Sequence, residues 1–362
     1  MRISRPATYA VGVVTAAALL AGCTGTGGSQ TALAPGSGTN SFAAAHAGGV
    51  GPLNRTTSIT SVKSRPVHRD HHKSWVSPDV ARLPRLLFLS DSGTDDVYIY
   101  TMPAMALKGT LTGFSEPQGM CSAPDGSIWV TNTGTQQTLW YSRAGTPIGS
   151  LSDPSGYPVG CAVNPTNGDV AVTNIFDVSG NGGVEIYPGG SGSPTFYTNP
   201  AQSEYFFPAY DRSGNLYVDG FGNSGFALSE LPAGSSTMST VGVSGGTIYF
   251  PGGVNWNRTA GDLTIGDQEC NGGADSCVYT LSVSGSTATI TGSTPLQNFD
   301  GTACDVDQGT IAPFGRYFAG GCITEGSSFS SADRWAFPTG GTPTNYNISG
   351  LSEPIGAAIS NK

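Results

Sequence analysis

A strand–turn–strand unit recurs along the chain from Arg82 onward, and this repeat constrains the fold more than any other feature of the sequence. In its clearest copy, Glu116-Pro117-Gln118-Gly119 leads through the turn Pro124-Asp125-Gly126 to a second strand over residues 127–132. Further copies start at residues 158, 208 and 251 and, in degenerate form, near Phe299-Asp300-Gly301. The spacing of 41 to 50 residues is that of β-propeller blades.

Composition and strand pattern agree with an all-β fold. With 53 Gly, 24 Pro and only 11% charged residues, the chain favours turns over long amphipathic helices. A third apolar strand follows the second in most copies, as at 97–100, 138–141 and 184–187, and a more polar fourth strand comes after it. A four-stranded sheet of this kind has two apolar faces, which radial stacking around an axis buries.

The two ends of the repeat region complement each other. Leu351-Ser352-Glu353-Pro354-Ile355-Gly356 repeats the pattern of residues 114–119, but no second strand follows it. Residues 85–91 form a second strand that has no first strand before it. We therefore expect a six-bladed β-propeller of four-stranded blades over residues 79–362, closed by the C-terminal strand joining the N-terminal blade.

The endings Val130-Thr131-Asn132 and Val172-Thr173-Asn174 resemble the NHL and YVTN families of propeller repeats. The resemblance extends more loosely to gluconolactonase-like propellers and to streptogramin lyase. Propellers carry binding, scaffolding and catalysis alike, so the resemblance implies the fold rather than an activity. Chemistry of the streptogramin lyase or paraoxonase kind requires histidine, and residues 82–362 contain none. A gluconolactonase-like site, in which Asp, Glu and Asn oxygens hold a divalent cation, is the catalytic option that remains.

Oxygen-bearing side chains recur at the ends of the second strands and could converge on one rim. The candidate residues are Asp91, Asn132, Asn174, Asp219 and Asp267, with Asp300 from a later blade. Such ligands suit Ca²⁺ or Mg²⁺. Asn and Asp after a strand also cap turns through their own side chains, and repetition in most blades favours that structural role. Both interpretations stay open.

The N-terminal residues read as a lipoprotein leader. Arg2 and Arg5 precede an apolar run over residues 10–21 that is too short to span a bilayer, and Leu20-Ala21-Gly22-Cys23 has the form of a lipoprotein cleavage box. We expect a signal peptide over residues 1–22 and a lipidated Cys23; the alternative is an ordinary signal peptide. Thr24 is not the Asp associated with inner-membrane retention, which favours the outer membrane if the source has one.

Residues 23–78 lack apolar periodicity, and we expect them to form a flexible, low-complexity tether that starts at the lipidated cysteine. All four histidines, His46, His68, His71 and His72, lie in this segment. A histidine-rich tract can bind transition metals, and it can equally be a solvated part of the linker.

Six cysteines remain after Cys23, an even number that fits an oxidising compartment. Cys270 and Cys277 bracket a Gly-rich loop, Cys304 and Cys322 fall on adjacent strands of one blade, and Cys121 and Cys161 hold matching places in neighbouring first strands. We expect these three pairs to be disulfides, although six cysteines allow 15 connectivities.

The net charge and the aromatic residues of the chain indicate which kinds of partner it can bind. The net charge of −9, without a Lys/Arg cluster, argues against nucleic-acid binding. Tryptophans at 129, 140, 256 and 335 are expected between the blades, and any aromatic ring at the rim would offer stacking surface. We expect an extracytoplasmic, membrane-anchored module that binds an envelope protein or a small neutral ligand; the alternative is a Ca²⁺-dependent, lactonase-like hydrolase.

Overall fold

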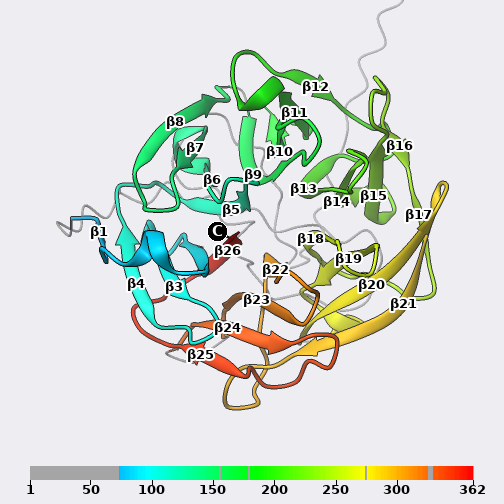
Figure 1. Cartoon of the computed structure of the whole chain (residues 1–362). Coiled ribbons are helices and arrows are strands. Elements are labelled where there is room, and N and C mark those ends of the chain that lie inside the picture. Colours follow the sequence, from blue (N-terminus) through cyan, green and yellow to red (C-terminus); the bar gives the residue numbers. More distant parts are fainter. Residues whose placement is uncertain (1–72, 155, 178–179, 274, 325–328, 362) are drawn as a thin grey trace, which may run out of the picture.

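A computed structural model describes residues 73–361 except 155, 178–179, 274 and 325–328. Within these residues, strands β1 to β26 form six sheets that stand as blades around a common axis (Figure 1). The sheets are antiparallel except for one short parallel pairing. The expected all-β, six-bladed propeller is therefore confirmed.

The first three blades follow the chain in order. Blade 1 consists of β1 (Trp75–Val76), β2 (Arg85–Asp91), β3 (Asp96–Thr101), β4 (Leu107–Leu111) and β26 (Pro354–Asn361). Blade 2 consists of β5 (Pro117–Ser122), β6 (Ile128–Asn132), β7 (Gln137–Tyr141) and β8 (Pro147–Ser152). Blade 3 consists of β9 (Gly156–Val163), β10 (Val170–Asp177), β11 (Gly183–Tyr187) and β12 (Thr195–Tyr197).

The other three blades complete the ring. Blade 4 consists of β13 (Glu204–Tyr210), β14 (Leu216–Gly222), β15 (Gly225–Leu231) and β16 (Ser239–Thr240). Blade 5 consists of β17 (Gly242–Ser244), β18 (Pro251–Asn257), β19 (Asp262–Asp267), β20 (Ser276–Ser284) and β21 (Thr287–Leu296). Blade 6 consists of β22 (Gly309–Ile311), β23 (Tyr317–Cys322), β24 (Ser331–Ala336) and β25 (Asn345–Asn347).

Helical structure in the described residues is limited to four single 3₁₀ turns. These are η2 (Val80–Arg82), η3 (Thr133–Thr135), η4 (Pro188–Gly190) and η5 (Cys270–Gly272). In this part of the chain no helix has the length and apolar character needed to cross a membrane.

The ring is closed by the pairing of β26 with β2, as expected from the sequence. Leu87 lies opposite Ile359 and Leu89 opposite Ala357 in an antiparallel ladder. At the outer edge of the same blade, Trp75 of β1 pairs with Thr110 of β4. This strand precedes residue 79, where we expected the domain to start.

The Pro-x-Gly sequence that begins several first strands has a steric reason. The first strands β5, β9, β13, β18, β22 and β26 are the innermost of their blades (Figure 1). A Cβ on Gly356 of β26 would lie 2.1 Å from the Gln118 carbonyl oxygen of β5, and one on Gly119 would lie 2.3 Å from the Val159 oxygen of β9. Glycine is therefore required where neighbouring blades touch backbone to backbone.

The hydrophobic core lies between the blades. Trp129 is buried and stacks on Trp140 with ring centroids 4.9 Å apart, and Trp335 is buried against Phe318. Trp256 is partly buried and stacks on Tyr217 of the preceding blade. The expected placement of these tryptophans is thus confirmed.

The start of blade 6 differs from the sequence expectation. Residues 298–302 form a turn, in which the Gly301 N–H donates to the Asn298 carbonyl and Gly301 has a φ of 81°. The first strand of the blade, β22, begins only at Gly309. Phe299-Asp300-Gly301 resembles Phe250-Pro251-Gly252 at the entry to β18, but here Asp300-Gly301 forms an ordinary turn.

Three disulfides link the six described cysteines in the expected pairs. Cys121–Cys161 joins β5 to β9 and hence two neighbouring blades. Cys270–Cys277 closes the loop between β19 and β20, and Cys304–Cys322 lies within blade 6. Such a set is typical of proteins that fold in an oxidising compartment.

Candidate functional site

Asp91, at the end of β2, shows what the recurring polar residues do. Its carboxylate accepts backbone N–H groups from its own loop, at Gly93 and Thr94, and from the entry to β26, at Ser352 and Glu353. Burial raises the pKa of Asp91, and these four hydrogen bonds oppose the rise. The side chain ties the second strand of the blade to the first.

Two other blades repeat this arrangement. The Asp267 carboxylate accepts N–H groups from Tyr249 and Phe250 at the entry to β18 and from Glu269 in its own loop. Asn132 Oδ1 accepts the Ser115 N–H just before β5, over 2.8 Å. These contacts are the structural role that repetition favoured, because each oxygen satisfies backbone donors of its own blade.

Asp219 in β14 is a partial version of the same arrangement. One carboxyl oxygen accepts the Phe207 N–H over 2.9 Å, and the other, Oδ2, has no hydrogen-bond partner. The side chain is fully buried, and this burial raises its pKa well above the usual range. Burial therefore favours the neutral form of this carboxyl group.

The expected rim residues lie on separate blades. Asp91, Asn132, Asn174, Asp219 and Asp267 belong to the second strands of blades 1 to 5 in turn, around the ring rather than at one point. Asp300 is exposed in the turn before β22, where its carboxylate accepts the N–H and hydroxyl of Thr302. These hydrogen bonds lower its pKa. Most of these residues therefore make hydrogen bonds within turns or between strands. Among the described residues, no two of them are hydrogen-bonded to each other.

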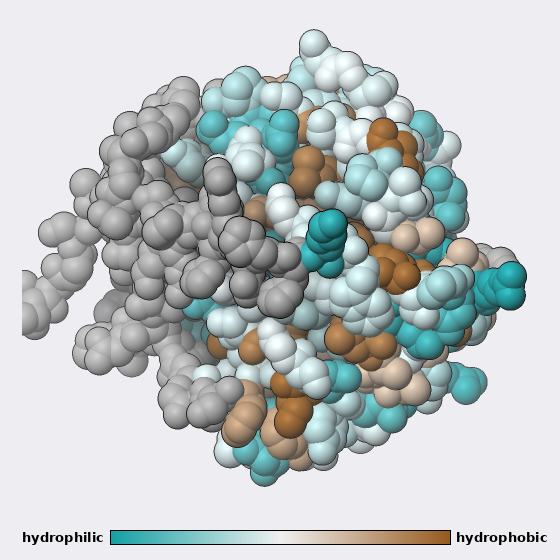
Figure 2. Space-filling view, turned by 90° about the vertical axis from the view of Figure 1, so that its left-hand side faces the viewer, coloured by the Kyte–Doolittle hydropathy of each residue, from teal (hydrophilic) through white to brown (hydrophobic). Residues whose placement is uncertain are grey.

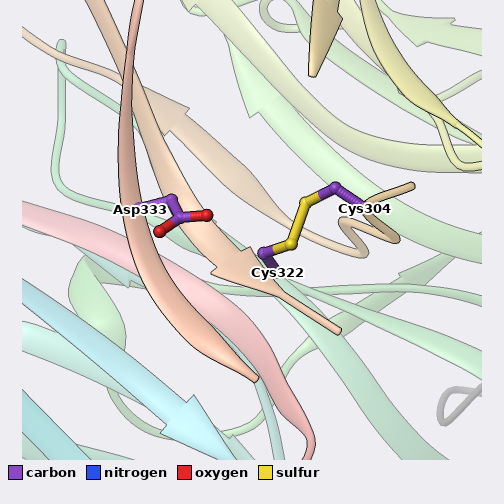
Figure 3. Close-up of side chains that lie close together, drawn as sticks. All are labelled: Cys304, Cys322 and Asp333. Atoms are coloured by element: carbon purple, nitrogen blue, oxygen red, sulfur yellow. A yellow bond between two sulfur atoms is a disulfide. The ribbon is translucent and has the colours of Figure 1, made fainter. Parts of the chain in front are cut away.

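In blade 6, a disulfide-bonded cysteine stands at the end of the second strand, where the other blades have Asp or Asn. Cys322 is the last residue of β23, the place that Asp267 holds in β19, and it is bonded to Cys304. Asp333 lies beside this disulfide (Figure 3), with its carboxylate and both sulfurs within 4.8 Å of one another. Burial raises the Asp333 pKa to about 8. Although cysteine and aspartate are metal ligands, both sulfurs are oxidised here and offer no thiolate.

Blade 3 departs from the pattern at Asn174. Its Oδ1 is buried and accepts no hydrogen bond. It lies near Asp153, which follows the last strand of blade 2. The charge of Asp153 acts on Glu185 of β11. Burial, opposed by a hydrogen bond from Tyr187 and aided by the charge of Asp153, raises the Glu185 pKa to about 7. Asp153 and Glu185 thus come from neighbouring blades, 2 and 3.

Partly exposed aromatic rings gather at the end of the propeller where the second strands finish. Phe221 of β14 lies opposite Phe226 of β15, and its ring packs edge-on against Phe250, 5.4 Å away. Tyr249, next in the chain to Phe250, is 38% exposed. We call Phe221, Phe226 and Tyr249 the aromatic surface. By contrast, the coloured residues in the side view of Figure 2 show small apolar patches separated by polar ones.

Sequence reasoning missed Asp153, Glu185 and the aromatic surface. Asp153 falls outside the repeat pattern, in the connection between two blades. Glu185 stands in a third strand, where a charged residue reads as solvent-facing. The one available signal was Val-Glu-Ile-Tyr over residues 184–187, in which an acidic residue interrupts an apolar strand.

Comparisons with known proteins give the fold. No family model matches the chain, and no curated protein matches its sequence. Among solved structures, it is similar to a protein of unknown function from Bacteroides caccae, with a TM-score of 0.56 and 12% identity over 77% of this chain and 100% of that one. It is also similar to TolB from Acinetobacter baumannii, with a TM-score of 0.57 and 13% identity over 79% of this chain and 68% of that one. At these identities the likeness establishes the propeller architecture alone.

Proposed function

We propose that this protein is a lipid-anchored, extracytoplasmic β-propeller that binds an envelope protein or a small neutral ligand. The proposed contact is the aromatic surface at the end of the ring where the second strands finish. The leader sequence, the three disulfides and the low charge of the chain support this role. The architecture shared with TolB is compatible with it.

The observation that carries the proposal is the exposure of Tyr249, which is next in the chain to Phe250, the residue whose ring packs against Phe221. Apolar rings with polar edges are the side chains that dominate binding energies at interfaces, because they bury a large area at small entropic cost. Tyr249 is 38% exposed, yet its backbone N–H is fixed by Asp267 over 3.1 Å. A rigid backbone that presents an exposed ring is suited to stacking on a sugar or a peptide.

Binding fits the chemistry of this chain better than hydrolysis does. The propeller segment contains no histidine to act as a general base. Asp91 and Asp267, two of the oxygen donors that a lactonase-like site would use, instead accept backbone N–H groups. We therefore propose no catalytic role for the residues at the ends of the second strands.

The test is site-specific photocrosslinking in the producing cell, with the full chain. A photoreactive residue replaces Tyr249 in one variant and Phe314 in another. Phe314 is 68% exposed but lies in the β22–β23 hairpin, at the opposite end of the ring. We expect a discrete crosslinked product, or protection by a neutral oligosaccharide, only at position 249. Equal crosslinking at both positions, or none at 249, would contradict the proposed surface.

The anchor has its own test, because Cys23 lies outside the described residues. Replacing Cys23 by Ala should abolish metabolic labelling by palmitate and move the protein from the membrane fraction to the soluble extracytoplasmic fraction. The matched control, Thr24→Ala, leaves the cysteine in place and should label like the wild type. Unchanged membrane association of Cys23→Ala would rule out the lipid anchor and leave the binding surface untested by that result.

A further inference from the structure

One face of the blade 3 sheet carries a row of polar side chains. Glu185 lies opposite Val172 in the register of β10 and β11, and Asn174 opposite Gly183. Since alternate residues of a strand share a face, Asn174, Glu185 and Tyr187 project to the same side. That side meets blade 2, because the Tyr187 hydroxyl lies 3.2 Å from the Ser152 carbonyl at the end of β8.

Asp153 approaches this face from blade 2. The connection after β8 is held by the Asp153 N–H, which donates to the Gln136 carbonyl over 3.0 Å. Asp153 Oδ2 and Asn174 Oδ1 each lie 2.3 Å from the point that a Cβ of Gly156 would occupy. The two oxygens are therefore at most twice that distance apart, and the charge of Asp153 also acts on Glu185.

The amide oxygen of Asn174 gives an independent indication of a ligand. Its side chain is 1% exposed, and Oδ1 has no hydrogen-bond partner. A buried acceptor without a donor is destabilising, so such an atom calls for a partner. Two carboxyl groups, those of Asp153 and Glu185, lie at the same junction, and the charge of Asp153 acts on Glu185. A positive ion would satisfy all three groups at once.

We propose that Asp153, Asn174 and Glu185 form a divalent-cation site, best suited to Ca²⁺, at the junction of blades 2 and 3. All three donors are oxygens, which hard cations prefer, and Ca²⁺ accepts the irregular geometry of an amide oxygen with two carboxylates at about 2.3–2.6 Å. The site is separate from the aromatic surface and does not depend on the proposed function.

The test is calorimetric titration of the purified full chain, stripped of metal, with Ca²⁺ alone and Mg²⁺ alone. We expect saturable binding of one Ca²⁺, weaker binding of Mg²⁺, and a rise of about 3 °C or more in the thermal midpoint at saturating Ca²⁺. The histidine tract does not imitate this result, since imidazole is a poor ligand for Ca²⁺.

Variants separate a built site from weak surface binding. Glu185→Gln and Asn174→Leu should each reduce Ca²⁺ affinity at least tenfold. The matched control is Glu230→Gln, because Glu230 likewise accepts a tyrosine hydroxyl, from Tyr217 over 3.1 Å, and has no part in the proposed site. Absence of Ca²⁺ binding to the folded wild type, or equal loss in Glu230→Gln, would overturn the proposal.

Discussion

Gln308 and Met120 are joined by two hydrogen bonds across the axis of the propeller, although blade 1 separates the blades to which they belong. Met120 of β5 donates its N–H to Gln308 Oε1 over 2.8 Å, and Gln308 Nε2 donates to the Met120 carbonyl over 3.0 Å. The same Oε1 accepts the Ala357 N–H of β26 over 3.2 Å. One buried side chain thus connects three consecutive first strands at the point where the ring closes.

Replacing Gln308 by Ala should lower the free energy of unfolding by about 3 kcal/mol, because it leaves buried backbone groups of Met120 without partners. Replacing the half-buried Gln137 by Ala should lower the free energy of unfolding by less than about 1 kcal/mol. Urea denaturation of both variants, with disulfides intact, measures the difference. Equal stability of the two variants would show that the hydrogen bonds between Gln308 and Met120 contribute nothing to the free energy of unfolding.

Replacing Gly356 by Ala should destabilise the fold by about 2–3 kcal/mol or prevent ring closure, since the added Cβ would lie 2.1 Å from the Gln118 carbonyl oxygen. Gly149→Ala is the control: its Cβ would meet only Trp140, at 3.8 Å. Thermal unfolding of both proteins gives the comparison. A fully stable Gly356→Ala would mean that the first strands can move apart.

The fold was accessible from sequence because each blade repeats the same local signals. Pro117-Gln118-Gly119 and its copies mark first strands, and the copy at Pro354 revealed the closure with β2. The signals failed at blade 6, where Asp300-Gly301 forms an ordinary turn and β22 begins at Gly309. A three-residue first strand leaves too few residues for periodicity to show.

The candidate site was less accessible, because its residues come together only through the packing of blades. Sequence correctly placed Asp91 and Asp267 at the ends of second strands, but whether an oxygen faces backbone donors or a ligand depends on the loop opposite. Asp153 and Glu185 are 32 residues apart in numbering and lie in different blades. No local pattern predicts that they meet.

Reducing or replacing the disulfide between blades should cost more than removing the loop disulfide. Cys121–Cys161 spans 40 residues and Cys270–Cys277 spans 7. The chain-entropy model gives about 4 and about 2.5 kcal/mol for loops of these lengths. Paired Cys→Ser variants, compared by urea denaturation, test the order. A larger loss for the 270–277 pair would show that native contacts of that loop, rather than loop length, set the effect.

Asp333 should make stability depend on pH. Its pKa is raised by burial from 3.8 to about 8, so between these values the folded state holds a proton that the unfolded state releases. Stability from this group is therefore present at low pH and is lost as pH rises toward 8. Asp333→Asn, which stays neutral, should melt near the wild type below pH 3.8 and increasingly above it as the pH rises to 8 and beyond. The reverse order at pH 9 would exclude a raised pKa.

The pairing of β26 with β2 can form only after nearly the whole propeller segment has been synthesised. During synthesis, β2 emerges more than 250 residues before its partner, so the inner edge of blade 1 stays open while the other blades form. An open strand edge invites pairing with other chains. A chaperone that shields residues 85–91 until β26 arrives would therefore raise the yield of folded protein, and a ribosome that stops before residue 354 would release a chain unable to close.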